Sequence, residues 1–315
     1  MRIVKPYAKY LPTKGLSHNE HIARCARVCY ASDKTTDNDQ MVEGLIKKGH
    51  LSMLRHTTYY FKIDKFIFDG HFPNKLKESP YCRYAYDEFY DVIFFAMNGQ
   101  TYFEYQNYLK HFDDCFVTFE DIVKHDSELA RAVCRISIEC VSQLSTLREF
   151  NRVSPNNIAE QSTRYCNYTG SKFDGHVNLC IPHWITSFIE EGTIVTENDK
   201  FELVTGLGFL NEKLFDIVDL PEYYYLKGCY ESCELYDRLI NNCNIKLEDA
   251  RGVLPLDIAS KAVYTYFLDE WLEIINKRVY NTTGKAHPNA IKLGIEIKDI
   301  VDCVINDCYL IENVI

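Results

Sequence analysis

Several features that define whole classes of protein are scarce in this sequence. It has only 14 Gly, and no Gly-rich loop follows a strand in the Rossmann or P-loop manner. Its 35 Lys and Arg are outnumbered by 45 Asp and Glu, so polymeric nucleic acid is a poor partner, although a few arginines can hold one phosphate. No apolar run approaches a membrane span, and the start lacks the apolar region of a signal peptide. We therefore expect a cytoplasmic protein that binds neither a membrane nor a nucleic-acid polymer.

Thirteen cysteines, an odd number, are scattered along the chain, which is typical of free thiols in a reducing compartment. Two pairs have the CxxxC spacing, Cys25/Cys29 and Cys229/Cys233. On a helix this spacing puts both thiols on one face, where they could ligate zinc or pack as small hydrophobic side chains. Neither pair is accompanied by a second pair with ligand spacing, so we predict packing and no metal site.

The N-terminal part carries clear signals for helices and a strand. Ser17 and Glu20 form a capping box at the start of an apolar-striped helix. Asp37 is a possible N-cap of a second, short helix that ends at Gly49. The stretch "TTYYFKIDKFIF" is rich in β-branched and aromatic residues and predicts a strand.

The last predicted helix begins with a cap near Asp257 and continues to about Arg278. At helical spacing Phe267, Trp271 and Ile274 fall on one face with Arg278. An arginine at the end of an apolar stripe either snorkels to solvent or faces a ligand.

The middle of the chain gives longer and less certain elements. A long helix is predicted over about Ser127–Phe150, followed by a short strand and a helix in "GHVNLCIPHWITSFIEEG". Further helices are predicted over about 200–218 and 222–242. Residues 66–125 are mixed and are interpreted as an inserted helical elaboration. With no repeat or clear linker, the pattern predicts an α/β (α+β mixed) fold, as one compact domain over residues 1–315 with long helices and a small central sheet.

The segment "LREFNRVSPNNIAEQSTRYCNY" is the strongest candidate for a binding site. In an acidic chain it offers Arg148, Arg152 and Arg164 around a polar loop. Guanidinium groups and hydroxyls in such a loop suit a small anion such as a phosphate. The hydrogen-bonding residues between the arginines are Glu160, Gln161, Ser162 and Thr163.

Three blocks of the sequence resemble the flavin-dependent thymidylate synthases, the ThyX family. The first, "ARVCYASDKTTDNDQMVEGLIKKGHLSMLRHTTYYFKI", places Gly49, His50, Ser52 and His56 at the spacing of a Gly-His-x-Ser-x-x-x-His turn. The second, "REFNRVSPNNIAEQSTRYCNY", is similar to the family signature Arg-His-Arg, seven residues, Ser, then Arg-Tyr. The third is "ARGVLP" followed by a helix ending in "NKR". The blocks cover about half of the chain, and residues 66–125 match poorly.

The resemblance implies a ThyX-like fold and an activity. Members of the family are homotetramers whose active sites are assembled from several subunits. They convert dUMP to dTMP with methylene-tetrahydrofolate, FAD and NADPH, and no cysteine attacks the pyrimidine. The expected partners are therefore dUMP or a related pyrimidine deoxynucleotide, folate and further copies of this chain.

The positions that contact the nucleotide in the family are well retained. The resemblance makes Arg278, Ser162 and His56 the expected catalytic residues, although His56 could equally be a core histidine. The expected nucleotide-binding residues are Arg152, Glu160, Ser162, Arg164, Arg251 and Arg278.

The positions that contact flavin are largely replaced. The signature Arg-His-Arg is Arg152, Val153 and Ser154 here, and the usual glutamate before His56 is Arg55. Carboxylates near a flavin diphosphate would each be unfavourable. The positions expected at the cofactor are Ser52, Val153, Ser154, Phe267, Asp269 and Glu273. We therefore predict that nucleotide binding persists while FAD binding in the family's manner is weakened or lost.

Three functions remain open at this point. The first is a thymidylate synthase that holds FAD through substitute contacts. The second is a diverged enzyme, with or without flavin, that makes another one-carbon or C5 modification of dUMP or a related nucleotide. The third is a noncatalytic nucleotide-binding paralogue. A thiolate at Cys166, beside Arg164, is a further alternative, but packing is the preferred interpretation.

Overall fold

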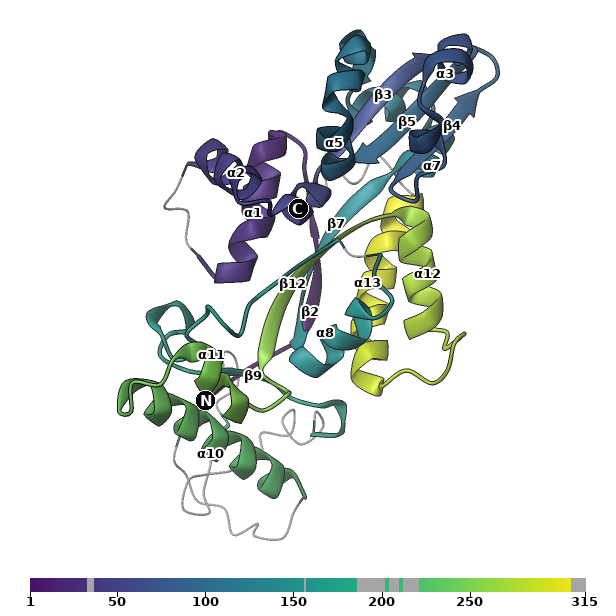
Figure 1. The fold of residues 1–315 in the computed structure, drawn as a ribbon. Helices are drawn as coiled ribbons and strands as arrows, with labels where there is room; N and C mark the ends of the chain where they lie inside the picture. The colour runs from purple at the N-terminus through teal and green to yellow at the C-terminus, as the bar shows by residue number, and fades with distance from the viewer. Residues whose placement is uncertain (33–36, 156, 186–201, 204–209, 212–220, 307–315) are drawn as a thin grey trace.

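The structure, a computed structural model, describes residues 1–32, 37–155, 157–185, 202–203, 210–211 and 221–306 (Figure 1). Its centre is a four-stranded sheet in the order β2-β7-β12-β8. The strands are β2 Tyr7–Leu11, β7 Arg135–Gln143, β12 Ala259–Phe267 and β8 Ile158–Glu160. Strands β7 and β12 pair antiparallel over all nine residues, which places Phe267 opposite Arg135.

Helices cover both faces of this sheet (Figure 1). On one face lie α1 His18–Tyr30, α2 Asn38–Lys47 and the 3-10 helix η1 Leu51–His56. On the other lie α8 Leu144–Asn151, α12 Leu268–Arg278 and α13 Pro288–Asn306. The predicted caps of the first two helices are confirmed: Ser17 and Glu20 form the capping box of α1, and Asp37 caps α2. Gly49 adopts a positive φ of 72° just beyond α2, as a helix stop requires.

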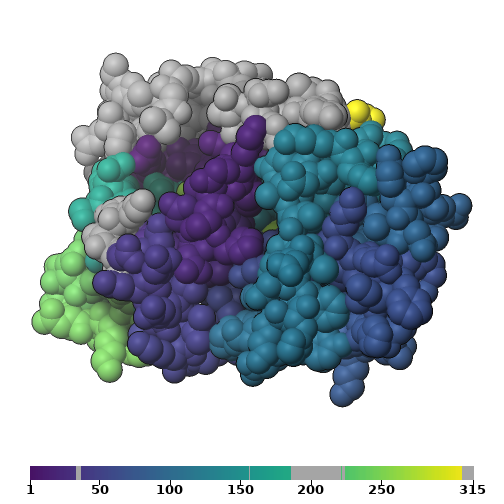
Figure 2. Space-filling view, turned by 90° about the horizontal axis from the view of Figure 1, so that it is seen from above, coloured from purple at the N-terminus to yellow at the C-terminus, as the bar shows by residue number. Residues whose placement is uncertain are grey.

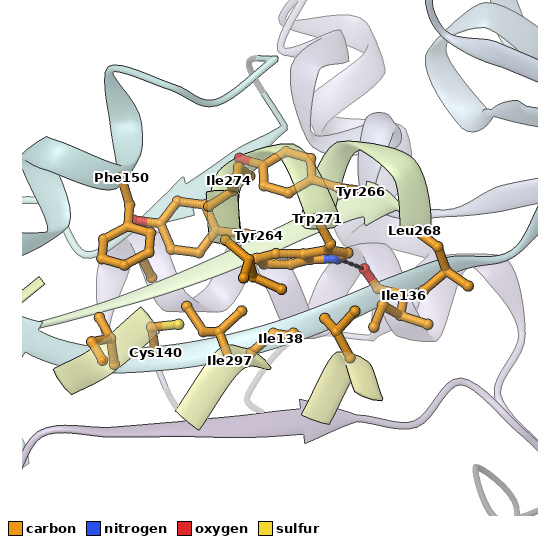
Figure 3. Close-up of a cluster of buried hydrophobic side chains, with 14 of the residues drawn as sticks. Ile136, Ile138, Cys140, Phe150, Tyr264, Tyr266, Leu268, Trp271, Ile274 and Ile297 are labelled. Atoms are coloured by element: carbon orange, nitrogen blue, oxygen red, sulfur yellow. Dashed lines mark hydrogen bonds between the residues drawn. The ribbon is translucent and has the colours of Figure 1, made fainter. Parts of the chain in front are cut away.

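The main core lies between the sheet and helices α8, α12 and α13 (Figure 3). Trp271 is fully buried, and its indole Nε1 donates to the carbonyl of Ile136 on β7 at 3.3 Å. The Tyr266 ring packs edge-on against it at 4.9 Å. Buried aromatic rings contribute large apolar areas, so this contact fixes α12 on the sheet and sets where Arg278, its last residue, lies.

A second four-stranded sheet has the order β4-β5-β3-β6 (Figure 1). Its strands are β3 Thr58–Asp64, β4 Cys82–Asp87, β5 Val92–Asn98 and β6 Phe116–Val117. Its helices are α3 Lys65–His71, α4 Asn74–Lys77, α5 Gly99–Leu109, η2 Lys110–Cys115, α6 Phe119–His125 and α7 Ser127–Val133. We call residues 58–133 the inserted unit. Its two ends meet, because Arg135 donates to the carbonyl of Thr57 at 3.0 Å.

The remaining elements lie at the end of the molecule opposite the inserted unit (Figure 1). Strands β1 Arg2–Val4 and β9 Asn178–Cys180 pair in parallel, and β10 Glu202–Leu203 pairs with β11 Leu210–Asn211. The helices are η3 Ser171–Phe173, η4 His183–Ile185, α10 Pro221–Asn241, α11 Leu247–Ala250 and η5 Arg251–Val253. None of the helices that the structure describes has the length and apolarity to cross a membrane.

Two of the predicted long helices are wrong in part. Within Ser127–Phe150 the structure has α7, then the nine-residue strand β7, then α8. The predicted helix that ends at Arg278 begins only at Leu268, because Ala259–Phe267 forms β12. Both errors have one cause: "RISIECVSQ" and "ASKAVYTYF" are buried and paired with each other, so a long-range contact overrides the local pattern.

Other predictions have mixed outcomes. The strand in "TTYYFKIDKFIF" is confirmed as β3, which ends at Asp64, and the helix at 222–242 is confirmed as α10. The segment 66–125 is not purely helical, since it contributes β4 and β5 to a sheet. Of the helix predicted at 200–218, the structure describes only the paired strands β10 and β11, and the rest lies outside the described residues. The short strand predicted in "GHVNLCIPHWITSFIEEG" is confirmed as β9, and the part of the predicted helix from residue 186 onward lies outside the described residues.

Candidate functional site

A tight turn directly after β8 carries the predicted nucleotide-binding Ser162 and Arg164. The Ser162 hydroxyl accepts a hydrogen bond from the Arg164 backbone N–H at 3.1 Å. The Ser162 N–H donates to the carbonyl of Cys29 near the end of α1 at 3.0 Å. The second bond attaches residues 162–165, which we call the Ser162 turn, to α1, and the preceding residue, Gln161, donates to the carbonyl of Lys261 on β12 at 2.8 Å.

Two exposed guanidinium groups meet at the Ser162 turn. Arg164 donates to the Glu248 carboxylate at 2.9 Å, with side chains 51% and 41% exposed. Arg251 donates to the hydroxyl of Thr163 at 2.9 Å and to the carbonyl of Glu248 at 3.1 Å. Exposed ion pairs contribute little to stability, so a phosphate dianion could replace Glu248 as the partner of Arg164 at low cost.

Glu160 lies on β8, two residues before the turn, and is half-buried. One carboxylate oxygen accepts from the Asn151 amide at 2.7 Å, while the other has no partner among the described residues. Burial raises the pKa of the Glu160 carboxyl, and the Asn151 hydrogen bond and the Arg148 charge partly offset this. A buried oxygen without a partner is costly unless a ligand or water supplies a donor.

Arg278 and Arg152 form a second group at the end of α8. The Arg278 guanidinium donates to the carbonyl of Glu149 through Nε at 3.1 Å and also through Nη2. Partial burial lowers the pKa of Arg278, Glu149 raises it, and the Arg152 charge lowers it. Arg278 therefore caps the last turn of α8, next to a second cation.

The described contacts do not assemble the three residues predicted as catalytic. His56 is 1% exposed, and its Nδ1 is 2.8 Å from the hydroxyl of Thr265. Burial holds the pKa of His56 well below its usual value, so the ring is neutral. Ser162 lies in the turn after β8, and Arg278 is the last residue of α12, beside the end of α8. His56, buried and neutral, has the surroundings of a core histidine.

Two of the positions expected at the cofactor, Phe267 and Asp269, contact Arg83 of the inserted unit. Phe267 is 2% exposed, and the guanidinium groups of Arg83 and Arg135 lie 4.8 and 5.6 Å from its ring centre. Arg83, on β4, forms an ion pair with Asp269 at 2.9 Å and lies 3.7 Å from Glu270. The carboxylate at position 269 thus has an internal cation as its partner.

The other cofactor positions offer little to a flavin diphosphate. Val153 packs against the main core, and the Ser154 hydroxyl bonds to the hydroxyl of Tyr266. Glu273 pairs with Lys277 one turn along α12, and Ser52 is exposed on η1. The group combines an apolar residue, a buried ring and two carboxylates, so these residues do not fit a flavin diphosphate.

Near Ser52, a further contact with the inserted unit involves Arg55. Its Nε donates to the Gln100 side chain on α5 at 2.6 Å, and its guanidinium lies 5.6 Å from the ring centre of Tyr81. Residues of the inserted unit therefore contact both η1 and the start of α12.

The cysteines of both CxxxC pairs are free. Burial raises the pKa of the Cys25 and Cys233 thiols to about 12, and that of Cys29 and Cys229 to about 11. Cys166 is 2% exposed within the second core cluster, and burial raises its pKa too. Protonated thiols are poor nucleophiles, and these buried side chains pack among hydrophobic residues.

Sequence reasoning missed several partners that shape the site. Arg164 bonds to Glu248, which lies 84 residues further along the chain. Glu160 bonds to Asn151, nine residues before it. Arg83 meets Asp269 across 186 residues. The sequence offers a signal only for Glu248, which lies in "LEDARGVLP", three residues before Arg251.

Comparison with known proteins identifies a family. Residues 106–302, more than half of the 315, match the model of the thymidylate synthase complementing protein family. The second and third blocks described above lie inside this range and the first lies outside it. A comparison with curated proteins finds no match.

Among solved structures, the chain is similar to the UMP/dUMP methylase PolB from Streptomyces cacaoi. With the complex that contains 5-Br dUMP, the identity is 12% and the TM-score 0.40, over 95% of this chain and 91% of that one. With the 5-Br UMP complex, the identity is 12% and the TM-score 0.41, over 97% and 92%.

Proposed function

Because the chain belongs to the thymidylate synthase complementing protein family, we propose that it binds dUMP at the Ser162 turn and methylates it at C5. The observation that carries this proposal is the pair of exposed guanidinium groups of Arg164, on the Ser162 turn, and Arg251, on η5, which donates to Thr163 of that turn. Two cations beside a hydroxyl match a phosphate dianion.

Each retained residue has a role in this proposal. Arg164 and Arg251 bind the phosphate, and Ser162 holds the turn in place. The free oxygen of Glu160 accepts a hydrogen bond from the N3–H of uracil. Arg152, at the end of α8, and Arg278, which contacts that end from α12, also bind the nucleotide. We also propose a homotetramer, in which these two arginines can act on the nucleotide of a neighbouring chain.

The reaction replaces the hydrogen at C5 of the pyrimidine by a methyl group. Methylene-tetrahydrofolate supplies the carbon, NADPH supplies the hydride that completes the methyl group, and the C5 proton leaves to solvent. FAD is the cofactor that the family resemblance implies. The residues at its positions do not suit it, and we assign no step to it.

That mismatch favours a second candidate function. In it the chain keeps the dUMP site and either modifies C5 without flavin or binds the nucleotide without changing it. The observations that favour it are the ion pair between Arg83 and Asp269 and the buried ring of Phe267.

Nucleotide binding is tested by calorimetric titration of the full chain with dUMP. Arg164→Ala and Arg251→Ala should each weaken binding by about 1.5–3 kcal/mol, the usual loss for a charged hydrogen bond. Arg131→Ala is the matched control, since Arg131 also pairs with an exposed carboxylate, that of Glu128. Equal affinities for all four proteins would show that the Ser162 turn is not the nucleotide site.

The reaction is tested by mass spectrometry of dUMP incubated with the protein, methylene-tetrahydrofolate and NADPH, with and without FAD. A product 14 mass units heavier only when FAD is present supports the thymidylate synthase. The same product without FAD supports the flavin-independent enzyme. Bound but unchanged dUMP supports the noncatalytic alternative.

A further inference from the structure

A cavity of about 860 Å³ opens between the inserted unit and the N-terminal part of the chain. Its walls come from residues 12–18 and the first residues of β7 on one side, and from β3, α5 and the β6–α6 segment on the other. In the space-filling view the purple N-terminal residues and the teal residues of the inserted unit lie side by side (Figure 2). No residue predicted to bind the nucleotide lines it. Its volume and its position at a junction are typical of small-molecule sites.

One wall of the cavity is aromatic. The rings of Tyr59 and Tyr102 are stacked, with centres 3.9 Å apart and planes 13° from parallel. His18 lies 4.1 Å from the Tyr59 ring, and Phe116 lies 5.8 Å from that of Tyr102. Burial raises the pKa of Tyr59 to about 12, so its phenol is uncharged at neutral pH. Such a wall favours a flat aromatic ring over an aliphatic chain.

Another part of the lining is a chain of buried hydrogen bonds. A guanidinium nitrogen of Arg24 lies 2.7 Å from Nδ1 of His21, and Nε2 of His21 lies 3.0 Å from the Ser137 hydroxyl. That hydroxyl is 2.7 Å from the hydroxyl of Thr265, which is 2.8 Å from Nδ1 of His56. A guanidinium can only donate, so Nδ1 of His21 accepts and its Nε2–H donates onward. Burial also lowers the pKa of His21 to about 3 and that of His56 well below 6.5, so both imidazoles are uncharged.

The buried cation in the lining is the Arg135 guanidinium, which is 8% exposed. Its Nη1 and Nη2 donate to uncharged oxygens, including the carbonyls of Thr57 and Thr265, both at 3.0 Å. No carboxylate in the described part of the chain forms an ion pair with it, and its Nε–H makes no hydrogen bond to the described residues. Burial lowers the pKa of Arg135 to about 10, with Glu270 opposing this from a distance, so the group remains a cation.

The two carboxylates that line the cavity belong to the first turn of α6. Asp121 accepts hydrogen bonds from the N–H and hydroxyl of Thr118 and so caps α6. Glu120 is half-buried beside it, and Lys14 lines the facing loop. The two carboxylates thus lie on α6, and Arg135 lies on β7.

We propose that this cavity binds a flat aromatic molecule that carries an anionic group. The ring lies against Tyr59 and Tyr102, and the anionic group is held at Arg135. Two independent features support the assignment: stacked, uncharged rings on one wall, and a buried cation without a direct counter-ion on another.

The test compares two fluorescent probes with the same ring system. 8-Anilino-1-naphthalenesulfonate carries an anion, and N-phenyl-1-naphthylamine does not. The full-length protein should bind one sulfonate probe per chain, about ten-fold or more tighter than the neutral probe, as a charged hydrogen bond implies. Equal affinity for the two probes, or no binding of either, would overturn the proposal.

Variants on the aromatic wall locate the probe. Tyr102→Ala should weaken binding of the sulfonate probe about ten-fold, because it removes one of the two stacked rings of the wall. Tyr105→Ala is the matched control, since Tyr105 also packs on the core of the inserted unit from α5 but does not line the cavity. His18→Ala, at an exposed position, repeats the test without disturbing that core. If both wall variants bind the probe like the Tyr105 variant, the cavity is not the site.

Discussion

The Ser162 turn and the start of α12 carry the two sets of residues that the family resemblance assigns to nucleotide and to flavin, and they differ in what their side chains contact. At the Ser162 turn, Arg164 and Arg251 are exposed and held by contacts that water or a phosphate can replace. At the start of α12, Phe267 is buried and Asp269 is paired with Arg83 of the inserted unit. Arg164 and Arg251 can therefore exchange their present partners for a ligand. In this second region, Phe267 could contact a ligand only by leaving the core, and Asp269 only by breaking its ion pair.

The largest expected effect concerns Phe267. Replacing it by the polar residue usual in the family, Phe267→Asn, removes a buried ring and should lower the free energy of unfolding by about 3–5 kcal/mol. Urea denaturation measures this. Phe66→Asn, at a side chain that is 76% exposed, is the control and should change stability by less than about 0.5 kcal/mol. If Phe267→Asn were as stable as the wild type and bound FAD, the second region would be an open ligand site.

Acid should weaken the fold through the buried histidines near the second region. Burial lowers the pKa of His21 to about 3 and that of His56 well below 6.5. As the pH falls below 6.5 the unfolded chain binds these protons and the folded chain does not, so stability is lost. Each histidine should contribute about 1.4 kcal/mol per pH unit to this loss.

Urea denaturation between pH 7 and pH 4 gives this slope. His21→Gln should reduce it by the contribution of one histidine, while His111→Gln, at an exposed position on η2, should leave it unchanged. A slope that is the same in His21→Gln and in the wild type would mean that His21 is protonated in the folded state.

The ion pair between Arg83 and Asp269 should be measurable by charge exchange. Asp269→Arg places two cations together and should destabilise the protein by about 1 kcal/mol, since the carboxylate side chain is 60% exposed. The double variant Arg83→Asp/Asp269→Arg should recover part of this loss. Glu273→Arg, which breaks only the pair with Lys277 along α12, is the control. Additive effects of the two exchanges would show that the inserted unit is not coupled to α12 here.

The smallest expected effect on stability is at Glu248. Glu248→Gln releases Arg164 from its carboxylate partner and should change the free energy of unfolding by less than about 1 kcal/mol. The affinity for dUMP should rise, by up to about five-fold, because the phosphate no longer competes with Glu248. Calorimetry measures the affinity, with Glu128→Gln as the control at the exposed pair with Arg131. A loss of affinity would mean that Glu248 itself contacts the nucleotide.

Local sequence determined the elements whose signals lie within a few residues of each other. The capping box at Ser17, the cap at Asp37 and the stop at Gly49 each depend on neighbouring backbone groups, and the structure has all three. The turn at Ser162, inside the predicted polar loop, is also local, because its hydrogen bond spans two residues.

Tertiary structure alone decided the rest. Strands β7 and β12 pair across more than a hundred residues, and this pairing converts two segments predicted as helix into strand. The partner of Asp269 comes from β4, and no local pattern indicates it, while that of Arg164 comes from α11, next to the "ARGVLP" block. Sequence therefore indicated which side chains could hold a nucleotide. The tertiary structure decided that Phe267 is buried and that Asp269 pairs with Arg83 of the inserted unit, because side-chain partners depend on contacts between distant segments.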